Sequence, residues 1–133
     1  MKRLPLYSLL LLVLITVVGC GSAVRKLDRP TPLFNAVRDS RAQQVKTIVK
    51  NGAETNVMYN GKTPISVAVE GDKREIVRML VEGGADIEQE AAYHNGAGMV
   101  QILPLGLAIS ENNHEMVKLL IELGADVNNT GSE

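Results

Sequence analysis

The chain has 133 residues, a formal net charge of −1 and a single cysteine. This length fits one domain with a modest core, and a lone cysteine excludes an internal disulfide, so stability has to come from packing. The charge balance gives no broad basic surface of the kind that nucleic acid requires, so the sequence predicts no nucleic-acid partner.

The first predicted element is an export signal at residues 1–19. Two basic residues precede an apolar run at 9–18, and Gly19 leads to Cys20. This order of charged, apolar and small residues is typical of a secretory signal. The run has about 10 residues, whereas a membrane-spanning helix needs about 20, so we expect the segment to be removed rather than kept as an anchor. Removal of its two positive charges changes the net charge from −1 to −3.

The segment Val17–Cys20 resembles the lipobox of bacterial lipoproteins. The resemblance implies cleavage before Cys20 and lipidation of its sulfur and its new amino group, with residues 20–30 as lipidated N-terminus and tether. Each methylene group that an acyl chain buries contributes about 0.8 kcal/mol to membrane binding. Because Gly21 and Ser22 follow, rather than the aspartate typical of inner-membrane lipoproteins, an outer-membrane location facing the periplasm is implied. The alternative is a secreted protein with a chance cysteine at the cleavage point.

Residues 31–133 contain a repeated pattern. The copies begin with TPLFNAV at 31–37, TPISVAV at 63–69 and LPLGLAI at 103–109. Self-similarity of this length predicts a stack of repeats. The three repeats are placed near 31–62, 63–102 and 103–133.

Each repeat predicts a pair of short helices, near 32–51, 64–82 and 104–122. The proline at the second position suits the first turn of a helix, and the apolar residues after it recur at helical spacing. A glycine ends each second helix, because glycine accepts the left-handed conformation found there. These glycines are Gly52, Gly84 and Gly124.

The copies resemble the ankyrin repeat, whose pattern is Thr-Pro-Leu-x-x-Ala, then Glu-x-Val-x-x-Leu, then Gly-Ala-Asp-Val-Asn. The third copy has EMVKLL at 115–120 and GADVN at 124–128. The resemblance implies an all-α fold, a short ankyrin-repeat solenoid of about three helix-turn-helix repeats. Leu103 replaces the usual threonine, so a hydroxyl contact is expected to be lost there. Asn35 replaces an apolar residue, so a polar N-terminal end is expected.

The second repeat carries about 7 extra residues relative to the family period of about 33. They lie in an insertion at 89–102, and insertions in repeat proteins map to loops on one face, often the binding face. Two interpretations stay open: a partner-contact loop, or a segment whose Met99, Val100 and Ile102 fold back on the stack.

Motifs for catalysis are missing. The sequence has no nucleophile elbow, no phosphate-binding glycine loop and no zinc-binding helix motif. His94 and His114 stand in unlike contexts, and Asp86 and Asp126 occupy equivalent turns, where a structural role is expected. The sequence therefore predicts no enzyme, no catalytic residue, no metal site and no cofactor.

The resemblance implies a partner surface made of turn tips and first-helix ends. Tyr59 and Tyr93 are predicted as exposed anchors, because tyrosine is enriched among interface hot spots. The positions expected on this surface are Asp28, Arg38, Asp39, Tyr59, Asn60, Lys62, Glu70, Tyr93, Met99, Val100, Ser110 and Glu111.

These observations predict a membrane-anchored protein-binding module of the bacterial envelope. Two versions stay open. One is an inhibitor that binds and neutralises an envelope-attacking toxin enzyme, since small ankyrin lipoproteins resemble in architecture some immunity proteins against effectors such as type VI secreted phospholipases. The other is a periplasmic scaffold or stabiliser of another envelope protein.

Overall fold

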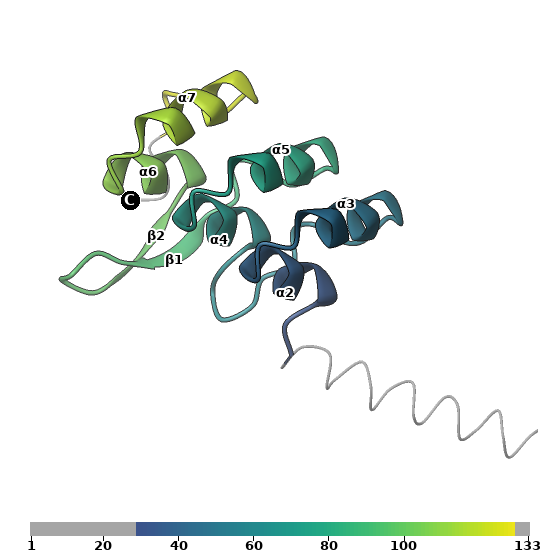
Figure 1. Cartoon of the computed structure of the whole chain (residues 1–133). Coiled ribbons are helices and arrows are strands. Elements are labelled where there is room, and N and C mark those ends of the chain that lie inside the picture. The colour runs from purple at the N-terminus through teal and green to yellow at the C-terminus, as the bar shows by residue number, and fades with distance from the viewer. Residues whose placement is uncertain (1–28, 130–133) are drawn as a thin grey trace, which may run out of the picture. The chain divides into compact units, whose positions relative to one another are not determined.

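The computed structural model describes residues 29–129. The predicted export signal, Cys20 and Asp28 lie outside the described residues. Six helices and one two-stranded sheet follow each other along this part of the chain (Figure 1). They are α2 (Pro32–Arg38), α3 (Ala42–Lys50), α4 (Pro64–Glu70), α5 (Arg74–Glu82), β1 (Ala91–His94), β2 (Met99–Ile102), α6 (Pro104–Ser110) and α7 (His114–Glu122).

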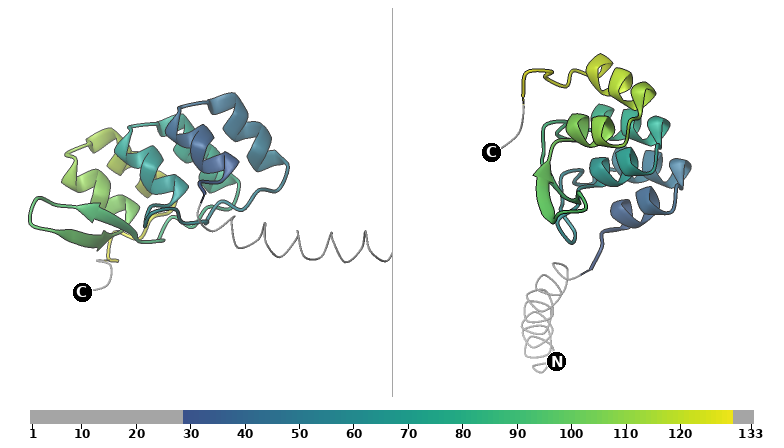
Figure 2. Two further views of the ribbon diagram at one scale, coloured as in Figure 1. Left: turned by 90° about the horizontal axis from the view of Figure 1, so that it is seen from below. Right: turned by 90° about the vertical axis from the view of Figure 1, so that its left-hand side faces the viewer.

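The helices form two rows. The first helices α2, α4 and α6 make one row and the second helices α3, α5 and α7 make the other (Figure 1). The hairpin lies on one side of these rows, as both views in Figure 2 show. The three predicted helix pairs and the all-α stack of three repeats are confirmed, with the small sheet as an addition.

Local sequence explains where the first helices begin. Thr31 Oγ1 accepts a hydrogen bond from the Phe34 amide, and Thr63 Oγ1 accepts one from the Ser66 amide, both at 3.1 Å. Ser66 Oγ in turn accepts from the Thr63 amide at 3.0 Å, which completes a capping box. Leu103 makes no such side-chain bond, as predicted, and α6 still begins at its proline.

The core lies between the two rows and is aliphatic. Each fully buried side chain of this size stabilises the fold by about 1.5–3 kcal/mol relative to its exposure. The large side chains that are less than 2% exposed include Leu33, Val37, Val45, Ile65, Val77, Leu80, Leu107, Met116 and Leu120. Every repeat contributes to this list, so the core is continuous along the stack.

The turns after the second helices are built as the sequence predicts. Gly52, Gly84 and Gly124 have φ values of 79°, 94° and 103°, in the left-handed region. Asp86 Oδ1 accepts from the Glu88 amide and Asp126 Oδ1 from the Asn128 amide, each at 2.9 Å. The structural role predicted for the two aspartates is confirmed.

Side chains also join one repeat to the next. Asn56 Oδ1 accepts from the Asp86 amide at 2.7 Å, and the equivalent Glu88 accepts from the Asp126 amide at 2.8 Å. Lys73 Nζ donates to the carbonyl oxygens of Val37 and Arg38, at 2.8 Å each. Burial of this ammonium lowers the Lys73 pKa, against the opposing effect of the Asp39 charge.

The insertion at 89–102, expected as a loop on one face of the stack, forms a β-hairpin. β1 and β2 pair in antiparallel register from Ala91↔Ile102 to His94↔Met99. The turn is held by Asn95, whose Oδ1 accepts from the amides of Ala97 at 3.0 Å and Gly98 at 3.1 Å. These bonds close the turn, so the strands pair instead of leaving their backbone groups to water.

Candidate partner-binding surface

The hairpin has one face toward the helices and one toward solvent. In an antiparallel pair, directly opposite residues share a face. Ala91 and its partner Ile102 face the stack: Ala91 is 1% exposed and Ile102 packs against the core. Met99, on the other face, is 64% exposed. Of the three residues expected to fold back on the stack, Ile102 does and Met99 and Val100 stay exposed; the partner-contact interpretation stays a prediction.

A second, shorter hairpin precedes α4. Tyr59 and Lys62 exchange backbone hydrogen bonds of 2.9 and 3.0 Å around Asn60 and Gly61. Both central residues have positive φ, 51° and 75°, as a type I′ turn requires. The Ala92 amide donates to the Gly61 carbonyl oxygen at 2.8 Å, so β1 is joined to this turn.

Two polar contacts connect the hairpins to the ends of first helices. Lys62 Nζ lies 2.6 Å from Glu70 Oε2 and 2.9 Å from Oε1. Tyr93 donates its hydroxyl hydrogen to Glu111 Oε1 at 2.9 Å. Each contact joins a hairpin to the end of a first helix, and the structure thereby brings four of the predicted positions together in two pairs.

The phenol of Tyr93 has an acidic environment. Its hydrogen bond to Glu111, then burial, then the charges of Glu111 and Glu70 raise the Tyr93 pKa above its ordinary value. Glu70 is itself paired with the Lys62 ammonium, 2.6 Å from its Oε2, so Glu111 is the carboxylate that acts most directly on the phenol. The Glu111 carboxylate beside the hairpin favours a partner with a basic group.

The raised pKa gives a first testable result. The protonated phenol is favoured in the fold, so its stabilising contribution is complete below the ordinary pKa of about 10 and is lost as the pH rises through the raised value. In an ultraviolet titration, Tyr93→Phe should remove the tyrosine that ionises last. Tyr59→Phe serves as the control. If Tyr93→Phe instead removed a tyrosine that ionises early in the titration, the raised pKa would not belong to Tyr93.

The two tyrosines are less exposed than the sequence predicts, and their role as partner anchors stays a prediction. Tyr59 is half-buried and packs edge-to-face on Phe34, with ring centroids 5.3 Å apart and planes at 68°. Tyr93 is also half-buried, and its hydroxyl is bound to Glu111. An aromatic ring is buried where apolar side chains lie close to it, and Phe34 is such a neighbour of Tyr59. Tyr59 therefore belongs to the fold.

The other predicted positions are exposed but less connected. Arg38 Nε lies 3.2 Å from Asp39 Oδ1, and Arg41 Nη2 lies 3.4 Å from Asp39 Oδ2. Exposed pairs of this kind contribute little to stability. Ser110 Oγ donates to the Gly106 carbonyl oxygen at 3.0 Å. Met99 and Val100, expected in turns, lie on β2 and are 64% and 37% exposed.

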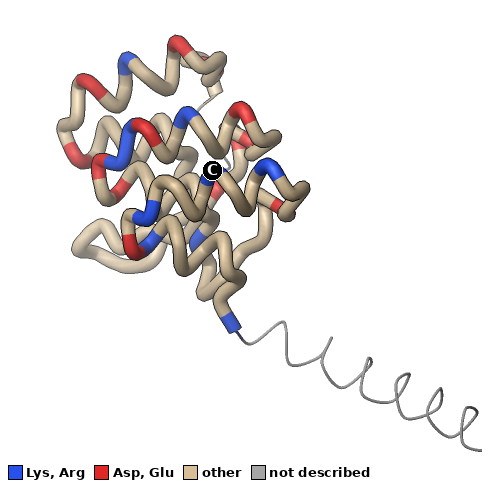
Figure 3. Tube along the Cα trace, turned by 45° about the vertical axis from the view of Figure 1, so that its right-hand side comes forward, with Lys and Arg blue, Asp and Glu red and all other residues tan. Residues whose placement is uncertain are grey.

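The surface around the hairpin is free of formal charge. Residues 91–110 contain no Asp, Glu, Lys or Arg, and the hairpin carries no coloured segment in Figure 3. The carboxylates of Glu70 and Glu111 border this stretch. An uncharged, partly apolar projection bordered by Glu111 and by the Lys62–Glu70 ion pair is suited to contact with a protein surface.

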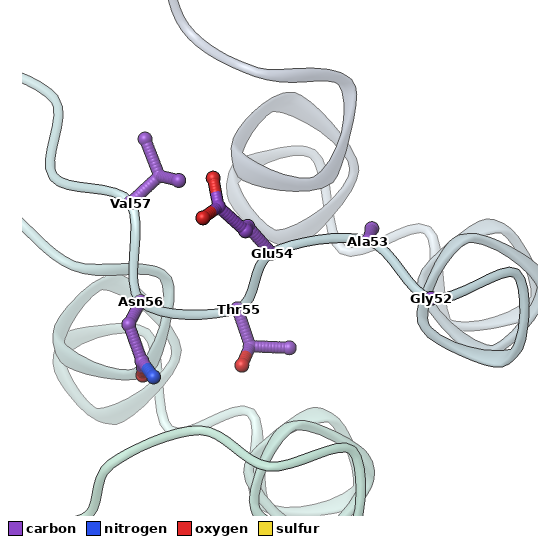
Figure 4. Close-up of a pocket in the computed structure, with 6 residues that line it drawn as sticks. All are labelled: Gly52, Ala53, Glu54, Thr55, Asn56 and Val57. Carbon is purple, nitrogen blue, oxygen red and sulfur yellow. The ribbon is translucent and has the colours of Figure 1, made fainter.

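A depression of about 310 Å³ is lined by the consecutive residues 52–57. In Figure 4, Glu54 and Val57 point to one side of the chain, and Thr55 and Asn56 to the other. Among residues 29–129, no three His, Cys, Asp or Glu side chains gather for a metal ion. No helix in the same range is long and apolar enough to cross a membrane.

Comparison with known proteins identifies the architecture. Residues 7–91 match the family described as ankyrin repeats (3 copies), and residues 100–132 match the ankyrin repeat. The chain belongs to the ankyrin-repeat family. It is a protein–protein interaction module of a typically non-enzymatic family, and no catalytic family matches.

One relative is the BRCA1-associated RING domain protein 1 of Caenorhabditis elegans. It is 44% identical over 55 residues, which cover 41% of this chain and 8% of that protein. The match therefore spans less than a tenth of this relative.

Proposed function

We propose that this protein is a membrane-anchored inhibitor, an immunity protein that binds and neutralises an envelope-attacking toxin enzyme such as a type VI secreted phospholipase. The observation that supports binding is the exposed hairpin: Met99 is 64% and Val100 37% exposed, and Tyr93 of the same hairpin donates a hydrogen bond to the Glu111 carboxylate. The partner is expected to place an apolar side chain on Met99 and a basic group against Glu111.

The anchor in this proposal is the lipidated Cys20 implied by the sequence. Ten residues, Gly21 to Pro30, separate it from Thr31, and a fully extended tether of this length spans about 35 Å. The inhibitor would stay at the surface that the toxin attacks, and confinement raises its effective concentration without new contacts.

The test begins with capture of partners from envelope extract by the lipidated protein, identified by mass spectrometry. The purified partner is then assayed for enzyme activity with and without the chain. Stoichiometric inhibition supports the proposal. A partner that binds and keeps full activity would instead support a scaffold or stabiliser.

The surface is tested with one charge reversal and a matched control. Glu111→Arg should weaken partner binding at least about tenfold, because a like charge replaces the acid beside the hairpin. Glu82→Arg makes the same change at an exposed position at the end of α5, and should leave binding unchanged. Equal affinities of the two variants, measured by calorimetry, would place the partner elsewhere.

Lipidation is tested at the cysteine. Cys20→Ser should release the protein from the membrane fraction, because acyl attachment begins at that sulfur. Radiolabelled palmitate should mark the wild type and not the variant, and equal labelling of both would refute the anchor. A soluble periplasmic form is expected to bind the partner in vitro and to protect cells less well at equal expression.

A further inference from the structure

The turn of the long hairpin holds an asparagine followed by a glycine, Asn95 and Gly96. Both residues are exposed, and the turn between β1 and β2 extends beyond the helices (Figure 1). In such a pair the glycine amide nitrogen is able to attack the side-chain carbonyl carbon of the asparagine, because glycine has no side chain that shields the nitrogen. The turn therefore carries both reacting groups of a succinimide-forming reaction.

Hydrogen bonds around the pair supply the two kinds of assistance that this reaction needs. His94 Nδ1 accepts from the Gly96 amide at 3.2 Å, which is within reach of a general base for the proton that this nitrogen has to lose. Asn95 Oδ1 accepts from the amides of Ala97 and Gly98, at 3.0 and 3.1 Å. Two amide donors on one carbonyl oxygen stabilise the negative charge of a tetrahedral intermediate.

Two further Asn-Gly pairs, at 51–52 and 60–61, allow a comparison within the same chain. Asn51 and Asn60 are exposed, as Asn95 is, so access to water does not distinguish the three pairs. The Gly52 amide donates to the Val49 carbonyl oxygen at 3.0 Å, and a carbonyl oxygen does not act as a base. Within residues 29–129, the pair at 95–96 is the one whose glycine amide is bound to an imidazole.

We propose that Asn95 is a site of self-catalysed deamidation, with His94 as the general base. His94 Nδ1 takes the Gly96 amide proton, and the nitrogen forms a bond to Asn95 Cγ while two amides hold the charge on Oδ1. The bond from Cγ to Nδ2 then breaks, and Nδ2 leaves as ammonia with the proton that His94 returns. Water opens the succinimide at either carbonyl carbon, which yields aspartate or isoaspartate and releases a proton.

The product changes both the charge and the shape of the hairpin. Residues 91–110 contain no Asp, Glu, Lys or Arg, and conversion adds a carboxylate at the turn. Isoaspartate also lengthens the backbone by a methylene group inside the turn that the bond from the Asn95 amide to the Gly98 carbonyl oxygen closes at 3.1 Å. The reaction needs no partner, so it is independent of the proposed function.

The test follows conversion in the folded, full-length chain at neutral pH by mass spectrometry of tryptic peptides. Cleavage after the basic residues places Asn95 in peptide 79–118 and both control pairs in peptide 51–62. Conversion at Asn95 should be at least about tenfold faster than at either control pair. In water enriched in heavy oxygen, the product should take up a labelled oxygen atom, because water opens the succinimide.

Two histidine variants test the base. His94→Gln keeps a polar side chain but removes the imidazole, and should slow conversion at Asn95 at least about tenfold. His114→Gln changes the other histidine, which is exposed at the start of α7, and should leave the rate unchanged. In denaturant the rates at the three pairs should converge, because the hydrogen bonds of the turn are lost. Circular dichroism checks that both variants are folded.

Three results would overturn the proposal. They are a rate at Asn95 no greater than at the control pairs in the folded chain, equal rates at Asn95 in the His94→Gln and His114→Gln variants, and a rate difference that persists unchanged in denaturant. The last result would assign the difference to the neighbouring sequence and not to the geometry of the turn.

Discussion

Leu80→Ala is expected to lower the free energy of unfolding by about 2–5 kcal/mol, the range for a fully buried leucine that leaves a cavity. Leu80 is 0% exposed and lies on α5 of the middle repeat, between two neighbours. Domains of this size have total stabilities of about 5–15 kcal/mol, so the loss is a large fraction. Chemical denaturation followed by circular dichroism measures it.

Two further substitutions serve as comparisons for Leu80→Ala. Leu120→Ala removes the equivalent side chain in α7, also 0% exposed, and should cost about the same. Val81→Ala shortens a half-buried neighbour of Leu80 and should cost less. A Leu80→Ala loss below about 1 kcal/mol would mean that the core around α5 is not packed as described.

Gly83→Ala is expected to destabilise the stack by about 1–3 kcal/mol through overpacking. A Cβ atom at this position would lie 2.1 Å from Val49 Cγ1 and 3.2 Å from the Met79 carbonyl oxygen. Gly83 ends α5 and Val49 belongs to α3, so the second helices of the first two repeats approach closely at this point. The loss is again measured by denaturation.

The cause can be separated with a double-mutant cycle. In the Val49→Ala background the obstructing methyl group is gone, so Gly83→Ala should cost less there, with a coupling of about 0.5–3 kcal/mol. Gly84→Ala is the control: its Cβ would meet open space, but its φ of 94° strains any other residue. The explanation would be contradicted if Val49→Ala reduced the stability loss caused by Gly84→Ala, or if it left the loss caused by Gly83→Ala unchanged.

The repeats could be predicted from the sequence because their signals are local. Proline starts α2, α4 and α6, and glycine follows the end of each second helix, so a few neighbouring residues determine each helix boundary. The hairpin could not be predicted in the same way. Its strands have four residues each, too few for a clear alternation, and the burial of Ala91 depends on contacts with helices distant in sequence.

The sequence could predict which positions lie on the candidate surface, but not which of their side chains contact one another. The ends of first helices and the turn tips follow from the family pattern, and Glu70, Glu111 and Lys62 lie there. The pairing of Lys62 with Glu70 and of Tyr93 with Glu111 depends on the angle of each hairpin, which no short-range signal carries. No local pattern predicts that Lys73 caps the end of α2, because the bond joins residues 36 positions apart.

The bond from the Ala92 amide to the Gly61 carbonyl oxygen has a consequence for the thermodynamics of recognition. It ties the long hairpin to the short one, and Tyr93 ties it again to α6. A projection held at both places loses little conformational entropy when a partner docks, because most of that entropy is already lost on folding. A hairpin freed by loss of these ties would have to be ordered at the moment of association, and its affinity would fall although every contacting side chain remained.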